Sequence, residues 1–335
     1  MTAPGTGETP ETGSSAPIIW TLTNGHAGFE SQVLGLAEAV GGTIVAKRVR
    51  PRMPWTHIPA SMALPPLSAV DATSDKLVPP WPDLLISCGR RTVGLALKIK
   101  LESAGRTFAV HIQDPLVDPR RFDLVAAPAH DGLEGANVIT TAGAVHRVTP
   151  EKLAAAAEQF RPMLAHLPRP LIAVLVGGSN RRYQMTAATM ANLSERLKLM
   201  CEKHSAGLAV TISRRTSAPC TAMLREKMAD LPALVWDGHG DNPYLGFLAL
   251  ADAFVVTEDS VSMISEVAST GKPVYVAALE GGGGRFRRFH MGLRAAGITR
   301  PLDGTLDDWN YTPPEDTAQV AAEVRKRMAE RKTAS

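Results

Sequence analysis

The sequence predicts an α/β protein made of two Rossmann-like domains, each with a parallel sheet, facing a central cleft. Short apolar runs recur along the chain, and each is followed by a cluster of Gly, Ser, Asn or Asp and then by a helical pattern. Strand, loop and helix in alternation are typical of parallel sheets with crossover helices. The pattern breaks at the Pro-rich segment 166–170 and then restarts, and 335 residues are enough for two domains.

The first domain is expected over residues 17–165, after a disordered tail at 1–16 that is rich in Gly, Thr, Pro and Ser. Its strands are predicted at 18–22, 84–87, 108–112 and 124–127, with helices over 29–40 and 93–105. Thr149 and Pro150 form a helix start, with Thr149 as N-cap, and the helix is expected to end at Pro162.

The second domain is expected over residues 170–310. Its predicted strands are 171–176, 208–212, 234–236, 254–256 and 274–278. A last helix is expected over 312–331, because Thr312 and Glu315 have the spacing of a capping box. Val320, Val324 and Met328 share one face of that helix, which is expected to cross back to the first domain.

The composition is that of a globular protein, with 44% hydrophobic and 21% charged residues. A net charge of +3 is too small to indicate a general nucleic-acid binder. The three cysteines are far apart and form no C-x-x-C pair, which argues against a disulfide framework or a structural metal. No apolar stretch approaches the roughly 20 residues of a membrane span, and the first residues lack the features of a signal peptide. We therefore expect a cytoplasmic protein, with peripheral membrane contact as an option.

Ligands of parallel sheets bind outside the carboxyl ends of the strands, where the polar clusters of this sequence lie. Gly177, Gly178, Ser179 and Asn180 follow one buried strand, and such a turn lets the backbone approach an anion. Arg214, Arg215 and Thr216 follow another, and two arginines can neutralise a diphosphate. The alternatives are an ordinary tight turn and a solvated pair of charges.

The stretch "VVTEDSVSMISEVASTGKPV" passes from a buried strand into a short helix. With Asp259 as N-cap, Ser262 and Glu266 lie on the same helix face as the cap. Glu266 is not needed for capping and could accept hydrogen bonds from ribose hydroxyls; the alternative is a solvent-exposed glutamate. Asn242 is expected to cap a helix that begins at Pro243, and Tyr244 could contact a base or a sugar.

The first domain contributes His26, between Gly25 and Gly28 at the end of the first strand. An imidazole placed in a cleft could act as a general base, although a lone histidine is more often structural. The turn at Gly89, Arg90 and Arg91 could bind an anionic group of an acceptor. The remaining cleft candidates of this domain are Asn24, Gln32, Gln113 and Asp114.

Two basic segments indicate surface roles. Arg48, Arg50, Arg52 and Trp55 lie in a loop that could rest on an anionic bilayer, the alternative being an ordinary loop. The run "GGGGRFRRF" could form a mobile lid or grip an anionic ligand, and it lacks the Walker A pattern. The sequence has no G-x-G-x-x-G after the first strand, no G-x-S-x-G and no H-E-x-x-H, which disfavours classical NAD enzymes, α/β-hydrolases and zinc proteases. No cofactor and no metal are expected.

The motifs "WTLTNGHAGFESQ", "RPRMPW", "LLISCGRRT", "HIQDP", "VLVGGSN" and "SRRT" occur in this order, ahead of the stretch quoted above. This set resembles the mitochondrial fission family named after the plant elongated-mitochondria factor, over nearly the whole chain after the tail. Plant members of that family are peripheral proteins of the mitochondrial outer membrane that help to recruit a dynamin-related protein. Bacterial members resemble GT-B glycosyltransferases, and some carry a nucleoside-diphosphate-sugar epimerase label.

The resemblance implies a GT-B-like fold and a site for a nucleoside-diphosphate sugar. Gly177 to Asn180 and the turn from Asp259 through Ser260 to Met263 would hold the donor diphosphate, and Glu266 would meet the ribose. The region Asn242 to Tyr244 would lie near the base, while His26 and Gly89 to Arg91 would face the acceptor. The expected activity is metal-independent transfer of the sugar to an acceptor at the membrane surface. A non-catalytic adaptor is the main alternative, and a nucleotide-sugar epimerase is a further one.

Overall fold

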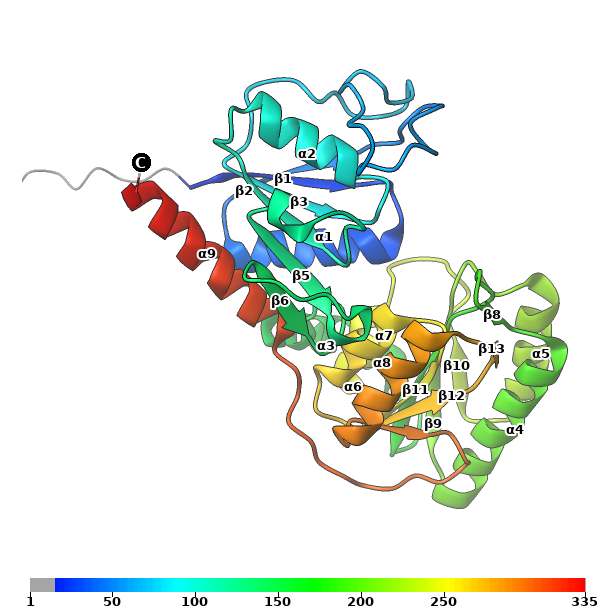
Figure 1. Cartoon of the computed structure of the whole chain (residues 1–335). Coiled ribbons are helices and arrows are strands. Elements are labelled where there is room, and N and C mark those ends of the chain that lie inside the picture. The colour runs from blue at the N-terminus through cyan, green and yellow to red at the C-terminus, as the bar shows by residue number, and fades with distance from the viewer. Residues whose placement is uncertain (1–15, 335) are drawn as a thin grey trace, which may run out of the picture.

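The computed structural model describes residues 16–334, so residues 1–15 of the expected tail lie outside the described residues. Its two main sheets each have six parallel strands, in the orders β2-β1-β3-β4-β5-β6 and β10-β9-β7-β11-β12-β14. Figure 1 shows the two sheets in separate halves of the molecule, with helices covering them. This architecture confirms the α/β prediction of two Rossmann-like parallel sheets.

The first half begins with β1, and its inner strands are fully buried, as expected for strands covered on both faces. Its strands are β1 (Ile18–Thr23), β2 (Thr43–Arg48), β3 (Leu84–Cys88), β4 (Phe108–Ile112), β5 (Leu124–Pro128) and β6 (Val138–Thr141). Its helices are α1 (Ala27–Val40) and α2 (Val93–Glu102), with 3-10 turns η1 (Pro119–Arg121) and η2 (Ala129–Asp131). The edge strands β2 and β6 were not predicted, because their partly exposed residues form no continuous apolar run.

The second half repeats this plan around β7. Its strands are β7 (Leu171–Val176), β9 (Gly207–Ile212), β10 (Ala233–Val235), β11 (Ala253–Thr257), β12 (Val274–Ala277) and β14 (Thr299–Pro301). A short antiparallel pair is formed by β8 (Tyr183–Gln184) and β13 (Glu280–Gly281), which are far apart in the sequence. The helices are α3 (Pro150–Leu164), α4 (Ala187–His204), α5 (Ala218–Met228), α6 (Tyr244–Leu250), α7 (Val261–Ala268) and α8 (Gly284–Ala295).

Helix α3 corrects two expectations about the middle of the chain. The Thr149 side chain accepts a hydrogen bond from the backbone N–H of Lys152, as predicted for an N-cap, but the helix continues through Pro162 to Leu164. Pro162 has no N–H, so α3 has one backbone hydrogen bond fewer in its last turn. Phe160 and Leu164 pack in the core of the second half, against α6, so the chain changes halves before α3 and not at residue 165.

Helix α9 (Asp316–Ala334) returns to the first half and lies along α1 (Figure 1). Val320 and Val324 are buried in the first core and Met328 packs against it, as the helical pattern predicted. The helix begins at Asp316, later than the Thr312–Glu315 signature indicated. The Asp316 carboxylate accepts hydrogen bonds from the backbone N–H groups of Ala142 (2.9 Å) and Gly143 (2.8 Å), which fixes the helix start to the loop after β6. Across residues 16–334 no helix is both long and apolar enough to span a membrane.

Candidate functional site

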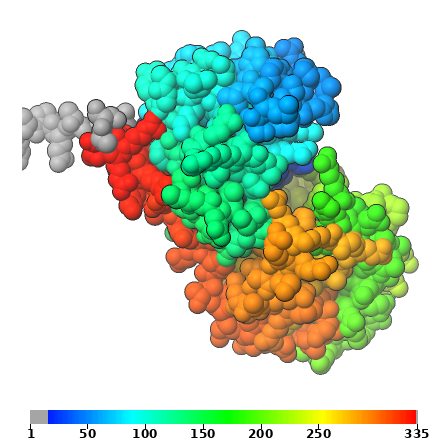
Figure 2. Space-filling view, in the orientation of Figure 1, coloured from blue at the N-terminus to red at the C-terminus, as the bar shows by residue number. Residues whose placement is uncertain are grey.

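The carboxyl ends of the two sheets face a recess between the halves of the molecule, visible in Figure 2 beside the green segment near residue 180. In the first sheet β1 lies between β2 and β3, and in the second β7 lies between β9 and β11. The strand order therefore reverses beside β1 and beside β7. In open α/β sheets ligands bind at such switch points, outside the carboxyl ends of the strands.

Helix α7 fits closely against the first half along one side of this recess. The Ser265 hydroxyl accepts a hydrogen bond from the backbone N–H of Ala144 at 2.9 Å. A Cβ added to Gly143 would lie 2.3 Å from Ser265 Oγ, and one added to Gly28 would lie 3.3 Å from Ser262 Oγ. Small residues and hydroxyls thus allow α7 to approach the start of α1 and the loop after β6.

Glu266 is buried at this contact, with 8% of its surface exposed, which contradicts the solvent-exposed alternative. Its carboxylate accepts hydrogen bonds from the Ser31 hydroxyl of α1 at 3.1 Å and from the Tyr244 hydroxyl of α6. Burial raises the pKa of Glu266, and the two hydroxyl donors partly oppose this shift. Burial and the neighbouring carboxylate also raise the pKa of Tyr244 well above its usual value. Glu266 therefore connects the two halves of the molecule.

Glu266→Ala is expected to lower the free energy of unfolding by about 1–3 kcal/mol, because the Ser31 and Tyr244 hydroxyls lose their acceptor. Glu266→Gln should stay close to wild type at pH 7, because the amide can accept from one hydroxyl and donate to the other. Burial raises the pKa of Glu266 in the folded state above its value in the unfolded chain. The carboxyl therefore contributes its full stabilisation at pH values below the unfolded pKa, and this contribution is lost as pH rises through the folded pKa. Wild type should thus gain stability relative to Glu266→Gln as pH falls towards 4.5.

Urea unfolding of these two variants, with the exposed Glu134→Ala as control, measures this prediction. A Glu266→Gln variant that is as unstable as Glu266→Ala would contradict it.

Asp259 does not cap α7, contrary to the sequence prediction. The adjacent Ser260 does, through a hydrogen bond from the backbone N–H of Met263 to its hydroxyl at 3.3 Å. The fully buried Asp259 carboxylate instead accepts from the Thr257 hydroxyl (2.6 Å) and the backbone N–H of Gly178 (3.2 Å). It also forms an ion pair with Arg215 at 2.6 Å, and so links the loops after β7, β9 and β11.

In the turn at Gly177–Asn180, the backbone N–H groups of the two glycines already donate to side chains of this network. Gly177 donates its N–H to the Thr257 hydroxyl at 2.8 Å, while Gly178 donates to Asp259. A Cβ on Gly177 would lie 2.2 Å from Asp259 Oδ1, and one on Gly178 would lie 2.3 Å from the backbone of Arg215. The glycines are therefore required for the packing of three loops, and the carboxylate of Asp259 takes the position that the prediction gave to an anion.

The other predicted residues of the second half have local hydrogen bonds. Ser179 accepts from the N–H of Met185 at 3.0 Å, and Asn180 accepts from the N–H groups of Arg182 and Tyr183. The Thr216 hydroxyl donates to the carbonyl of Gly177. Asn242 accepts from the N–H of Tyr244 at 3.0 Å, but α6 begins at Tyr244 and Pro243 occupies the N-cap position, so the predicted N-cap role of Asn242 is wrong.

On the first half, His26 is exposed at the N-terminus of α1, where its ring lies 5.7 Å from that of Phe29. Its backbone N–H donates to Asn24 at 3.4 Å. Gly25 and Gly89 have positive φ angles, and a Cβ on Gly89 would lie 2.8 Å from the Phe29 ring.

Gln32 is buried behind this loop, and its side chain accepts a hydrogen bond from Gln113 at 3.4 Å. It also donates to the carbonyl of Gly28 at 3.1 Å. Asp114 pairs with Arg285 of α8 at 3.5 Å, so it takes part in a contact between the halves.

Several exposed arginines at the strand ends have no side-chain partner within the described part of the chain. They lie in the loops after β3, β7 and β9, and they are Arg90, Arg91, Arg181, Arg182 and Arg214. Unpaired positive charges on both sides of the recess create a field that attracts an anion. Across residues 16–334 no group of three or more His, Cys, Asp or Glu side chains is placed to hold a metal ion.

Several arginines of the two basic segments are already bonded to protein groups, which the sequence did not indicate. Arg48 pairs with Glu30, and Arg52 donates to the carbonyl of Ser68 at 3.0 Å. The run after the glycines forms helix α8, whose Arg285 pairs with Asp131 at 3.0 Å and whose Arg288 donates to the carbonyl of His130. Sequence reasoning missed this helix because its first residue belongs to the glycine run.

The family model described as "Mitochondrial fission ELM1" matches residues 27–328. The "Mitochondrial fission protein ELM1" of Arabidopsis thaliana is 34% identical over 277 residues, which cover 75% of this chain and 65% of that protein. The chain thus spans about two thirds of the length of this relative. The "Uncharacterized protein RP120" of Rickettsia prowazekii is 25% identical, covering 77% of this chain and 82% of that protein.

Two solved structures are similar in fold. The UDP-GlcNAc 2-epimerase of Methanocaldococcus jannaschii, in complex with UDP-GlcNAc and UDP, aligns with a TM-score of 0.51 and 11% identity, covering 92% of this chain and 99% of that one. A UDP-glucosyltransferase of Polygonum tinctorium aligns with a TM-score of 0.50 and 13% identity, covering 95% of this chain and 93% of that one. These likenesses concern the fold, and they confirm its GT-B-like arrangement.

Proposed function

The chain belongs to the Mitochondrial fission ELM1 family, and from this premise we propose that it binds a nucleoside-diphosphate sugar in the recess between its halves. We propose further that it transfers the sugar to an acceptor, as a glycosyltransferase-type protein. The observation that carries this proposal is that both topological switch points open onto one recess bordered by unpaired arginines.

Each half has its own part in this reaction. Arg181 and Arg214, at the ends of β7 and β9, neutralise the leaving diphosphate with forked hydrogen bonds. Glu266 reaches a ribose hydroxyl when the ligand replaces Ser31 as its hydrogen-bond donor. His26, exposed on the opposite side, accepts the proton of the attacking hydroxyl. An acceptor at a membrane surface would meet the loop with Arg50 and Arg52.

A thermal-shift screen with UDP-, GDP-, ADP- and CMP-sugars tests the binding step. We expect stabilisation by one nucleotide class, and calorimetry should show about tenfold or greater weakening in Arg181→Ala/Arg214→Ala, since two charge-assisted hydrogen bonds are lost. Arg161→Ala on α3, which removes another exposed and unpaired arginine, is the matched control. Stabilisation by no nucleotide sugar would refute the proposal.

A non-catalytic adaptor is the second candidate, and one observation favours it. Asp259 already satisfies the N–H of Gly178, and Glu266 is engaged between the halves, so two expected ligand groups serve the fold. An adaptor would show no shift with any nucleotide and no release of nucleoside diphosphate. If a nucleotide sugar binds and is converted without an acceptor, product analysis would identify epimerisation in place of transfer.

A further inference from the structure

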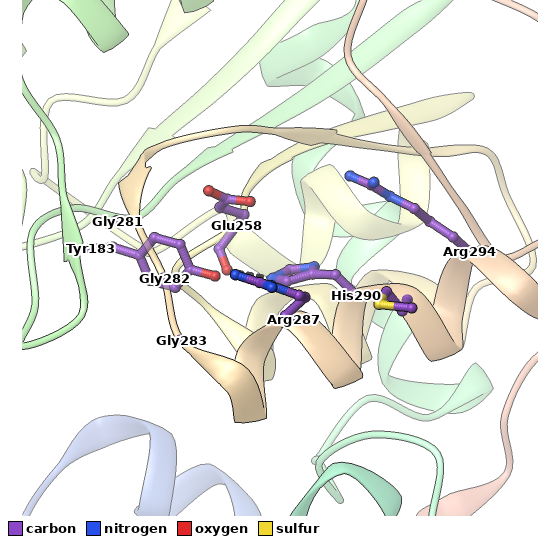
Figure 3. Close-up of a pocket in the computed structure, with 9 residues that line it drawn as sticks. Tyr183, Glu258, Gly281, Gly282, Gly283, Arg287, His290 and Arg294 are labelled. Carbon is purple, nitrogen blue, oxygen red and sulfur yellow. Dashed lines mark hydrogen bonds between the residues drawn. The ribbon is translucent and has the colours of Figure 1, made fainter.

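A small cavity of about 160 Å³ lies beside the recess, between the end of β11 and helix α8. Figure 3 shows Glu258 and Tyr183 on one side of it and Arg287, His290 and Arg294 along the helix. Arg287 belongs to the run "GGGGRFRRF", for which a grip on an anionic ligand was one expectation, whereas Tyr183, Glu258, His290 and Arg294 were not among the predicted site residues. At roughly 30 Å³ for each water, the cavity is large enough for a tetrahedral anion with a few waters.

Helix α8 presents two different arginine faces. Arg285 and Arg288 contact Asp131 and His130 of the first half. Arg287 and Arg294 lie seven residues apart, with His290 between them, and this spacing places all three on one face that lines the cavity. The side chains of the first face have direct protein partners, whereas those of Arg287 and Arg294 have only the longer-range attraction between Arg294 and Glu258.

The polar groups of the cavity are incompletely satisfied within the described residues. The guanidinium groups of Arg287 and Arg294 form no hydrogen bond or ion pair there. His290 is 6% exposed, and its Nε2 donates to the carbonyl of Glu258 at 2.9 Å, while its buried Nδ1 has no partner. Because Nε2 carries the proton, Nδ1 is an acceptor, so it fits a water or the hydroxyl of a protonated phosphate in the cavity.

The balance of charge favours an anion. Two guanidinium groups face a single carboxylate, and one oxygen of that Glu258 carboxylate already accepts from the N–H of Leu279 at 2.8 Å. In Figure 3 the Tyr183 hydroxyl and the Arg287 guanidinium point towards one another, and no protein acceptor is bonded to that hydroxyl.

We propose that this cavity binds a phosphate group, held by the guanidinium groups of Arg287 and Arg294 and by the hydroxyl of Tyr183. Arginine forks match the oxygens of phosphate, and the hydroxyl supplies a further donor. Gly281 and Gly282 at the rim have φ angles of +109° and +101°, so the backbone here makes a turn that side chains rarely allow. The phosphate is either the free ion or the end of a phosphate ester. This site goes beyond the proposed function, because it uses neither Arg181 nor Arg214.

Titration of the full chain with inorganic phosphate and with methyl phosphate, in phosphate-free buffer at constant ionic strength, tests the proposal. Calorimetry and thermal shift should show saturable binding that weakens about tenfold or more in Arg287→Ala/Arg294→Ala. Arg161→Ala and Arg181→Ala/Arg214→Ala should bind phosphate as wild type does. Tighter binding of methyl phosphate would identify an ester as the ligand, and tighter binding of inorganic phosphate would identify the free ion.

Three outcomes would overturn the proposal. The first is no saturable binding of either probe up to about 10 mM, where affinity has become negligible. The second is unchanged affinity in the Arg287→Ala/Arg294→Ala variant. The third is loss of phosphate binding in Arg181→Ala/Arg214→Ala alone, which would place the anion in the recess. Nucleotide-sugar binding is scored separately, so this proposal and the proposed function can fail independently.

Discussion

Replacing Asp259 by alanine is expected to lower the free energy of unfolding by about 3 kcal/mol. The change removes the acceptor of the Thr257 hydroxyl and of the Gly178 N–H, and it leaves Arg215 without its partner. Each buried donor left without an acceptor costs about 1–3 kcal/mol, while Arg215, whose side chain is 40% exposed, is solvated and adds little. Chemical unfolding followed by circular dichroism and by tryptophan fluorescence measures the change.

Two further variants separate the ion pair from the hydrogen bonds. Asp259→Asn keeps an oxygen for Thr257 or Gly178 and should lose about half as much stability as Asp259→Ala. Arg214→Ala, next to the paired arginine but without a partner, should stay within about 0.5 kcal/mol of wild type. Equal stability of Asp259→Ala and Arg214→Ala would show that the network does not stabilise the fold.

Acid is expected to destabilise the protein through two buried histidines. Burial lowers the pKa of His111 to about 3 and that of His146 to about 4, so both imidazoles are neutral in the folded chain. A lowered folded pKa gives stability that is complete above the unfolded value of 6.5 and is lost as pH falls towards the folded value. Each histidine should thus cost about 2–3 kcal/mol between pH 6.5 and 4.5.

The comparison of variants isolates this effect, because burial raises the pKa of Glu258, Glu266 and Asp316 and their contributions have the opposite sign. Unfolding free energies of wild type, His111→Asn and His146→Gln should be measured from pH 7 to 4.5. In each histidine variant the unfolding free energy should fall less steeply with decreasing pH than in wild type. The difference in slope should correspond to about one proton fewer taken up on unfolding. His57→Gln, which removes an exposed imidazole, is the control. Parallel pH profiles for all four proteins would contradict the prediction.

The sequence predicted the buried strands well because burial on both faces leaves long apolar runs such as Leu171–Val176. It could not reveal β14 or β2, since edge strands with exposed residues lack that pattern. The placement of α3 also escaped prediction. Its apolar face is local information, but the choice between two cores depends on which partner helix is present, here α6.

The site shows the same division between local and distant information. The sequence showed that Ser262 and Glu266 share one face of α7. The partner of Glu266 is Ser31, 235 residues away, and no spacing rule connects the two. Asp259 and Ser260 are adjacent capping candidates, and only the fold decides that Ser260 caps while Asp259 pairs with Arg215. The face formed by Arg287, His290 and Arg294 had a readable helical spacing, which the preceding glycines concealed.

The return of α9 to the first half has a mechanical consequence. The chain passes between the halves twice, once before α3 and once between β14 and α9, and Asp316 fixes the second passage to the loop after β6. Two tethers restrict sliding and twisting more than they restrict bending about the line that joins them. Bending about that line would change the width of the recess, and the hydrogen bond from Ser31 to Glu266 holds the two halves together in this structure.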